Sequence, residues 1–88
     1  MIRRRVIVHG RVQGVFFRDT TRRMAESRGL AGAVANRADG TVEAVFEGPA
    51  AAVEQLVDFC RSGPERAAVE RVEVFDEQPQ GLEGFRVA

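Results

Sequence analysis

The sequence predicts an α+β fold in which two helices cover one face of an antiparallel sheet. Short stretches rich in β-branched residues alternate with two longer stretches of helical periodicity, and turn residues separate them. The elements follow in the order β-α-β-β-α-β, which is the split β-α-β arrangement of the ferredoxin-like folds. Two helices with one apolar stripe each would bury those stripes against the same sheet, which gives a two-layer sandwich.

The first half of the chain is expected to form a strand, a helix and a hairpin. Residues 3–9 are rich in β-branched side chains, which favours a strand. Apolar positions recur at helical spacing over residues 17–25, so a helix is expected there, and Gly29 would end it. Residues 31–36 and 41–46 are expected to pair as a hairpin, because the Asp-Gly pair between them favours a tight turn.

The second half is expected to form a helix and two strands. The helix would begin at Pro49 and end near Ser62, because its apolar positions repeat at i, i+3, i+4 and i+7. Cys60 lies on this stripe and is expected in the core; as the single cysteine it cannot form an internal disulfide. Valines alternate with charged residues over 71–74, which predicts a fourth strand, and residues 85–87 predict a short closing strand.

Length and composition indicate one globular domain spanning residues 1–88. The chain is 44% hydrophobic, which suffices for one core, and its charged residues balance to a net charge of zero. No apolar run approaches the roughly 18 residues of a membrane span, and the basic N-terminus lacks the apolar region of a secretory signal. We therefore expect a cytoplasmic monomer with no membrane partner. No Cys/His spacing indicates a metal site, so no metal or cofactor is expected.

Positive charge is concentrated in the first third of the chain. Residues 1–28 contain eight arginines against two carboxylates, whereas the remaining residues carry an excess of acid. Such an asymmetry can steer an anionic ligand toward the first third, although ordinary solvated faces also explain the charge pattern alone. In the hairpin, Glu43 and Glu47 alternate along one strand and are expected to share a solvated face.

Residues 10–18, with the sequence Gly-Arg-Val-Gln-Gly-Val-Phe-Phe-Arg, join the first strand to the first helix. Backbone N–H groups at the start of a helix have no helical acceptor, so such a loop can cradle an anion. Arg18 would add a guanidinium that binds two phosphate oxygens at once. Asn36 should lie nearby, because parallel first and second strands end at the same edge of the sheet. From the chemistry alone, a glycine-rich turn with an exposed arginine explains this stretch equally well.

Two motifs resemble the signatures of the acylphosphatase family. Residues 8–18, Val-His-Gly-Arg-Val-Gln-Gly-Val-Phe-Phe-Arg, match the first signature throughout. Residues 32–40 match the second at Gly32, Val34, Asn36 and Gly40. The resemblance covers nearly the whole chain, with one departure. Family members usually carry an aromatic residue, often Trp, where this chain has Ala33, and the change is expected to affect local packing or one wall of the site.

The resemblance implies an acylphosphatase that hydrolyses the carboxyl-phosphate bond of acyl phosphates without a metal. Arg18 would bind the phosphoryl group, and Asn36 would position the attacking water. The phosphate cradle would consist of the backbone amides of Val12, Gln13, Gly14, Val15, Phe16 and Phe17. The expected partner is a small acyl phosphate, and inorganic phosphate is expected as the product and as a competitive inhibitor.

Two alternatives come from other functional classes. One is a non-catalytic domain of the same fold that binds phosphate or another anion for regulation, which the departure at Ala33 leaves open. The other is an RNA-binding module, which shares the element order. Such a module needs aromatic residues on its two central strands, and here only Phe46 qualifies, so no nucleic-acid partner is expected. His9, at the end of the first strand, is expected to be a structural or partly exposed residue.

Overall fold

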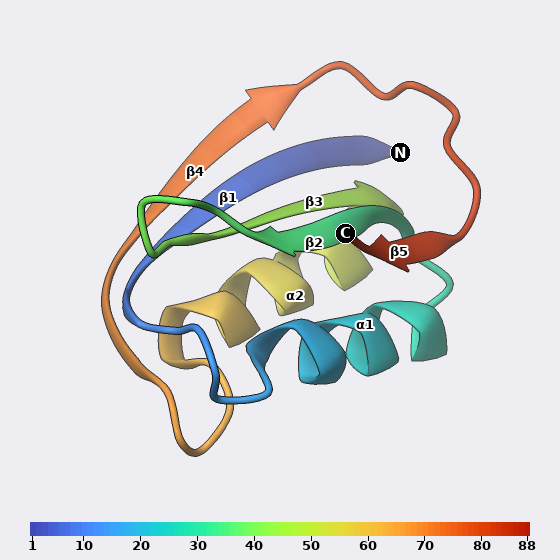
Figure 1. Cartoon of the computed structure of the whole chain (residues 1–88). Helices are drawn as coiled ribbons and strands as arrows, with labels where there is room; N and C mark the ends of the chain where they lie inside the picture. The colour runs from blue at the N-terminus through green and yellow to red at the C-terminus, as the bar shows by residue number, and fades with distance from the viewer.

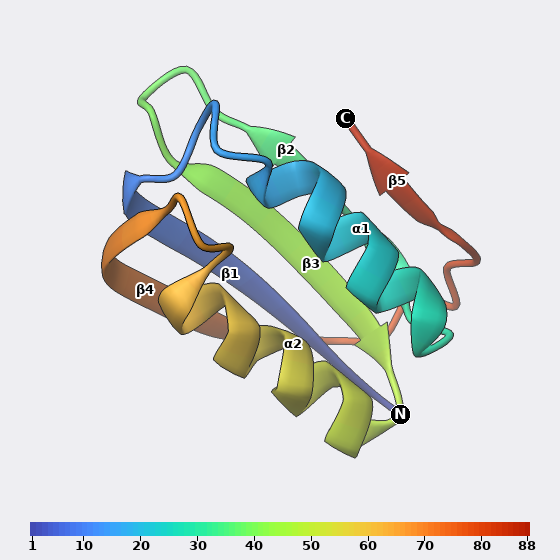
Figure 2. The same cartoon turned by 90° about the horizontal axis from the view of Figure 1, so that it is seen from below.

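A computed structural model describes all residues, 1–88, and arranges them in two layers (Figure 1). Both helices lie on one face of a five-stranded sheet, as the view from below shows (Figure 2). The predicted α+β, ferredoxin-like sandwich is therefore confirmed. The elements in chain order are β1 (Ile2–Arg11), α1 (Phe17–Ser27), β2 (Ala31–Asn36), β3 (Val42–Gly48), α2 (Ala50–Ser62), β4 (Ala68–Glu77) and β5 (Phe85–Val87).

The strands lie in the order β4-β1-β3-β2-β5. The first four pair antiparallel as predicted, and β1 and β2 run in the same direction on either side of β3. The short strand β5 pairs parallel with β2, which makes the sheet mixed. This direction follows from the path of the chain, because β4 ends at the edge of the sheet where β1 and β2 begin. Residues 78–84 cross this end of the sheet, so that β5 lies alongside β2 and runs in the same direction (Figure 1).

The core lies between the helices and the sheet face that they cover. Helix α1 contributes Phe17, Thr21 and Ala25, and α2 contributes four apolar side chains at the predicted spacing. Burial of each large apolar side chain contributes about 1.5–3 kcal/mol to folding. Cys60 is fully buried, as expected, and burial raises the pKa of its thiol to about 12. Neither helix is long and apolar enough to cross a membrane.

Strand β1 is longer than its β-branched centre indicated. It extends to Arg11, but beyond His9 it pairs only with β4, after a shift of register between His9 and Gly10. Gly10 has a φ of 125°, and a Cβ there would collide with the backbone of β4, so only glycine fits this irregularity. The loop therefore begins at Val12 rather than at Gly10. At the other helix, Pro49 is the N-cap residue and not the first helical residue.

The sheet face without helices, which we call the open face, carries paired charges instead of a second core. Its residues on β1, β3 and β4 are Arg3, Arg5, Ile7, His9, Glu43, Val45, Glu47, Arg71, Glu73, Phe75 and Glu77. Arg5 binds Glu77 and Glu43 through ion pairs of 2.9 and 3.4 Å. His9 contacts Glu73 at 2.6 Å and a guanidinium nitrogen of Arg71 at 3.2 Å.

Glu47 corrects the expectation that it shares a solvated face with Glu43. Its side chain is only 2% exposed, because residues 78–84 cross over it on their way to β5. The carboxylate accepts backbone N–H bonds from Gln80, Gly81 and Leu82 at 2.8, 2.8 and 3.1 Å. Arg3 binds the same carboxylate at 3.3 Å. These donors hold the pKa of Glu47 below its usual value, chiefly through the N–H of Gln80.

Candidate active site

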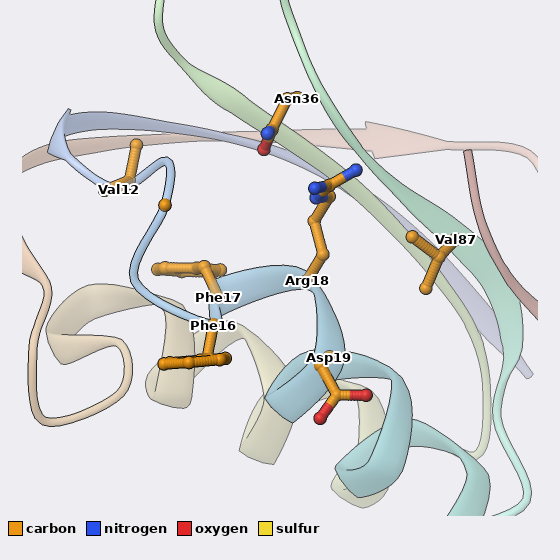
Figure 3. Close-up of a pocket in the computed structure, with 8 residues that line it drawn as sticks. Val12, Phe16, Phe17, Arg18, Asp19, Asn36 and Val87 are labelled. Atoms are coloured by element: carbon orange, nitrogen blue, oxygen red, sulfur yellow. The ribbon is translucent and has the colours of Figure 1, made fainter.

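A pocket of about 390 Å³ opens at the edge of the sheet where β1 and β2 end. The loop 12–16 forms one side, and the start of α1, the end of β2 and the end of β5 form the others (Figure 3). The topology thus places the first predicted motif beside the second, as expected from the parallel directions of β1 and β2. The lining residues are Val12, Gly14, Phe16, Phe17, Arg18, Asp19, Asn36 and Val87.

The loop is held by buried apolar side chains, and its backbone amides have no hydrogen-bond partner within the protein. Val12, Val15 and Phe17 are all at most 5% exposed, so they fix the loop against the core. None of the backbone N–H groups from Val12 to Phe17 donates a hydrogen bond within the protein. These donors are available to an anion at the positive end of the α1 dipole.

Two residues of the loop have left-handed backbone conformations. Gly14 has a φ of 73°, and Phe16 has a φ of 64°, the only positive value at a non-glycine residue. Left-handed residues recur in the backbone concavities that bind anions through successive N–H groups. For Phe16 this conformation costs about 1–3 kcal/mol, and the buried neighbours Val15 and Phe17 maintain it. Phe16 is 65% exposed at the pocket rim, and its ring lies near the guanidinium of Arg66.

Arg18 and Asn36 extend into the same space from opposite sides of the pocket (Figure 3). Arg18 lies in the first turn of α1, and Asn36 is the last residue of β2. Neither side chain forms a hydrogen bond or ion pair within the protein. The pocket therefore holds a positive charge without a carboxylate partner, beside an amide that can both donate and accept.

Asp19 lines the pocket but its carboxylate points away from Arg18 and Asn36 (Figure 3). It binds Arg22 at 2.9 Å and Arg23 at 3.2 Å. The hydrogen bond from Arg22 is the main cause of its lowered pKa, so Asp19 stays ionised near neutral pH. It thus neutralises the neighbouring arginines of α1 and leaves the charge of Arg18 uncompensated.

Most of the other arginines in the basic first third of the chain also have partners within the protein. Five of its arginines are engaged by carboxylates, namely Arg3, Arg4, Arg5, Arg22 and Arg23. Arg28 bonds to Gln55. Arg11 and Arg18, on either side of the loop, remain without such a partner. Of these two arginines, only Arg18 lines the pocket.

The structure brings most of the predicted site residues to the pocket wall. Gln13 and Val15 do not line it: the amide of Gln13 bonds to the β2–β3 hairpin, and Val15 points into the core. Sequence reasoning missed Asp19 and Val87. Asp19 adjoins Arg18 in the chain, which was an available signal. Val87 reaches the pocket through the parallel pairing of β5 with β2, which no local pattern indicates.

Ala33 lies on the open face and does not line the pocket. It borders a separate hollow of about 480 Å³ together with Val45, Leu82 and Arg86. Of the two effects expected from the missing aromatic residue, an effect on local packing fits this position, whereas an effect on a wall of the pocket does not. The absence of the aromatic residue concerns the packing of the open face, and it no longer supports a non-catalytic role.

Residues 4–87 match the acylphosphatase family model. The chain belongs to the acylphosphatase family. It is 55% identical to an acylphosphatase of Gloeobacter violaceus over 86 residues, which cover 98% of this chain and 92% of that protein. It is 56% identical to an acylphosphatase of Haloarcula marismortui over 85 residues, covering 97% and 93% of the two chains.

A solved structure extends the similarity to the fold. The crystal structure of an acylphosphatase from Bacillus subtilis superposes with a TM-score of 0.95 at 38% identity. The match covers 100% of this chain and 99% of that one. The loop, the hairpin and β5 are thus all part of the backbone shared with an acylphosphatase, and the enzyme class of the relatives extends to this chain.

Proposed function

We propose that the chain hydrolyses acyl phosphates to a carboxylate and inorganic phosphate, with the phosphoryl group bound by the loop and Arg18 and the water positioned by Asn36. The observation that carries this proposal is the set of unpaired polar groups at one pocket. Residues with unpaired backbone N–H groups (Val12, Gly14, Phe16 and Phe17), an arginine without a carboxylate partner and an asparagine without a hydrogen-bond partner line the same pocket. A tetrahedral anion with an attacking water would satisfy all three.

Arg18 fits the pocket best when an anion is bound. A cation in the first turn of a helix meets the positive end of the dipole, at a cost of about 0.3–1 kcal/mol. A phosphoryl group placed between the loop amides and the guanidinium reverses this cost, because its oxygens accept hydrogen bonds from both. The planar guanidinium can bind two of these oxygens. As charge shifts during the reaction, these prepositioned donors stabilise the equatorial oxygens.

Asn36 would orient the water in line with the bond that breaks. Its carbonyl oxygen can accept a hydrogen bond from the water, and its N–H group can donate to a phosphoryl oxygen. The water oxygen forms a bond to phosphorus while the bond between phosphorus and the acyl oxygen breaks. The electron pair of the broken bond stays on the acyl oxygen, which leaves as a carboxylate. An amide is too weak a base to remove the water proton, so a phosphoryl oxygen of the substrate takes it.

Inorganic phosphate should compete with the substrate. The product retains the oxygens that the loop and Arg18 bind, so it would occupy the same pocket. The acyl group would extend toward the exposed rim, where Phe16 and Val87 supply apolar surface.

Hydrolysis of benzoyl phosphate in the presence of EDTA tests this proposal. We expect turnover to survive chelation and to fall by about 10²–10³-fold in both Arg18→Ala and Asn36→Ala, because each removes a group aimed at the transition state. Arg18→Ala should also lose inhibition by phosphate, whereas Asn36→Ala should retain it. Arg86→Ala is the matched control, since Arg86 is an exposed arginine of β5 that borders the hollow of the open face.

The two variants separate binding from water positioning. Wild-type turnover in folded Arg18→Ala would overturn the assignment of the phosphate site. Full turnover in folded Asn36→Ala would instead overturn the role of Asn36 while leaving the cradle intact. A wild-type protein that binds phosphate without hydrolysing benzoyl phosphate would show that the pocket only binds anions.

A further inference from the structure

We propose that Gln13 is a positioning residue, whose side-chain amide fixes the phosphate-binding loop to the β2–β3 hairpin and so sets the place of Asn36 relative to the phosphoryl group. This inference rests on the proposed function, because it needs phosphate at the loop and water at Asn36. It assigns to the side chain of Gln13 a task distinct from that of its backbone N–H group.

The contact consists of two hydrogen bonds from a single nitrogen. Nε2 of Gln13 donates to the backbone oxygen of Arg37 at 2.8 Å and to that of Thr41 at 3.0 Å. An amide nitrogen carries two hydrogens, so each carbonyl can receive one of them. The two carbonyls belong to opposite sides of the hairpin neck, where Arg37 N donates to Thr41 O at 2.9 Å.

The orientation of the amide follows from the chemistry of its partners. Both groups facing the tip of Gln13 are carbonyl oxygens, which can only accept. A rotated amide would place its own oxygen against them and lose both bonds. Glutamine is therefore matched to this position, whereas glutamate would bring a negative oxygen against two acceptors.

The contact lies one residue away from the pocket on each side. Gln13 stands between Val12 and Gly14, which line the pocket, and Arg37 directly follows Asn36. A shift of Gln13 relative to Arg37 would therefore change the separation between the loop amides and the amide of Asn36. The two bonds control the distance on which the attack of water depends.

No other hydrogen bond fixes the loop to the hairpin. The pairing of β1 with β3 ends at Val8 and Val42, before the loop begins. Within residues 12–16, the only other hydrogen bond is the one that Phe16 O accepts from Thr20 N, inside the first turn of α1. Buried side chains hold the loop in the core, but only Gln13 sets its position relative to the hairpin by directional contacts.

The hairpin keeps its own shape without Gln13. Asp39 accepts hydrogen bonds from the N–H and hydroxyl groups of Thr41 at 3.0 and 2.6 Å, which also lower the pKa of this carboxyl. Gly40 N donates to Arg37 O at 3.1 Å. Removal of the Gln13 amide should therefore loosen the position of an intact hairpin rather than unfold it, which predicts a larger effect on kcat than on stability.

Gln13→Met tests the proposal, because methionine is similar in length but offers no donors. We expect kcat for benzoyl phosphate to fall by at least about 10-fold, since a displacement near 1 Å can cost up to about 100-fold. The inhibition constant for inorganic phosphate should change by less than about 3-fold, because the loop and Arg18 bind it. Gln55→Met is the matched control, since Gln55 is an exposed glutamine of α2 that bonds to Arg28.

A double-mutant cycle distinguishes positioning from a general structural role. If Gln13 acts through Asn36, adding Gln13→Met to Asn36→Ala should not lower kcat further. A second variant, Gln13→Asn, keeps the donors on a shorter side chain that cannot reach both carbonyls. Gln13→Asn should show the same loss of kcat and retain inhibition by phosphate. This variant replaces Gln13→Met in the test if Gln13→Met does not fold.

Three outcomes separate this proposal from the one that it rests on. Wild-type kcat in a folded Gln13 variant would overturn the positioning role while leaving the proposed function intact. An equal loss in the presence and absence of Asn36 would show that Gln13 acts independently of it, which also overturns the inference. Full turnover in Asn36→Ala itself would instead refute the role of Asn36 under the proposed function.

Discussion

The pocket and the open face of the sheet use arginine in opposite ways. On the open face, Arg3 binds Glu47 and Glu77, and Arg5 binds Glu43 and Glu77. At the pocket, Arg18 has no acidic partner, and the amides of the adjacent loop donate to nothing in the protein. Polar groups that are satisfied internally contribute to stability, whereas those left unpaired are available to a ligand. Arginine content alone does not distinguish the two regions, because both contain this residue.

The difference arises from the topology at the two ends of the strands. Residues 78–84 cross the end where β1 and β2 begin and cover the carboxylate of Glu47. At the opposite end, the loop 12–16 and the hairpin border a pocket and leave it open to solvent. One end of the sheet is therefore covered by residues 78–84, whereas the other has a pocket that is open to solvent.

Replacing an arginine by methionine in each region should give the largest difference between effects on stability and on activity. Arg3→Met should lower the Tm by about 10 °C or more, because it leaves the carboxylate of Glu47 without its charged partner in a site that is 2% exposed. Arg18→Met should leave the Tm within about 2 °C and abolish most turnover. Thermal melts by circular dichroism and benzoyl phosphate assays measure both. Similar changes in Tm for the two variants would remove the distinction between the regions.

Acid should weaken the open face of the sheet. Folding lowers the pKa of Glu47 and of Glu77, through backbone N–H groups at the first and arginines at the second. The stability that they contribute is therefore complete above their unfolded pKa of about 4.3, and it is lost as the pH falls through the folded values. The Tm should decrease between about pH 5 and pH 3.

Glu47→Gln should reduce this dependence on pH. The variant should melt roughly 5–15 °C lower at neutral pH, because a neutral amide accepts the backbone N–H bonds more weakly. Its Tm should then fall less steeply in acid than that of the wild type. Glu65→Gln, at an exposed position, is the control and should follow the wild-type profile. Parallel profiles for Glu47→Gln and the wild type would show that this carboxylate does not drive the acid transition.

The smallest effect is expected at Ala33. Replacement by phenylalanine places a ring at the hollow of the open face beside Val45 and Leu82. Partial burial of this ring should raise the Tm by a few degrees, on the order of 1 kcal/mol. Because Ala33 does not line the pocket, kcat/KM should remain within about 2-fold of the wild type. A change in kcat would show that the two faces of the sheet are coupled.

The fold could be predicted because its main elements carry local signals. The β-branched centre of β1, the turn signal before β3 and the apolar spacing of α2 each indicated the right element. The ends of the strands were less certain, because Gly10 and Arg11 continue β1 only by pairing with β4. That pairing depends on residues almost 60 positions away, which no local pattern includes.

The candidate site was predictable where one continuous segment forms it. The glycines and Arg18 of the loop lie close in the chain, and the parallel directions of β1 and β2 placed Asn36 nearby. Val87 and the side chain of Gln13 were missed, because their contacts depend on long-range packing. Glu47 was wrongly expected on a solvated face for the same reason, since strand alternation does not reveal that residues 78–84 cover it.

Cys60 can report on the separation of α2 from the sheet. It is the only cysteine in the chain, and its side chain is fully buried between α2 and the sheet. The thiolate is the form of cysteine that attacks a thiol reagent, and it is scarce in the folded protein because burial raises the pKa of Cys60 to about 12. Labelling must therefore wait until α2 separates from the sheet. The rate at which a thiol dye labels the native protein would therefore measure how often α2 separates from the sheet, without an engineered reporter. Comparing this rate among the variants would rank them by the frequency of this opening.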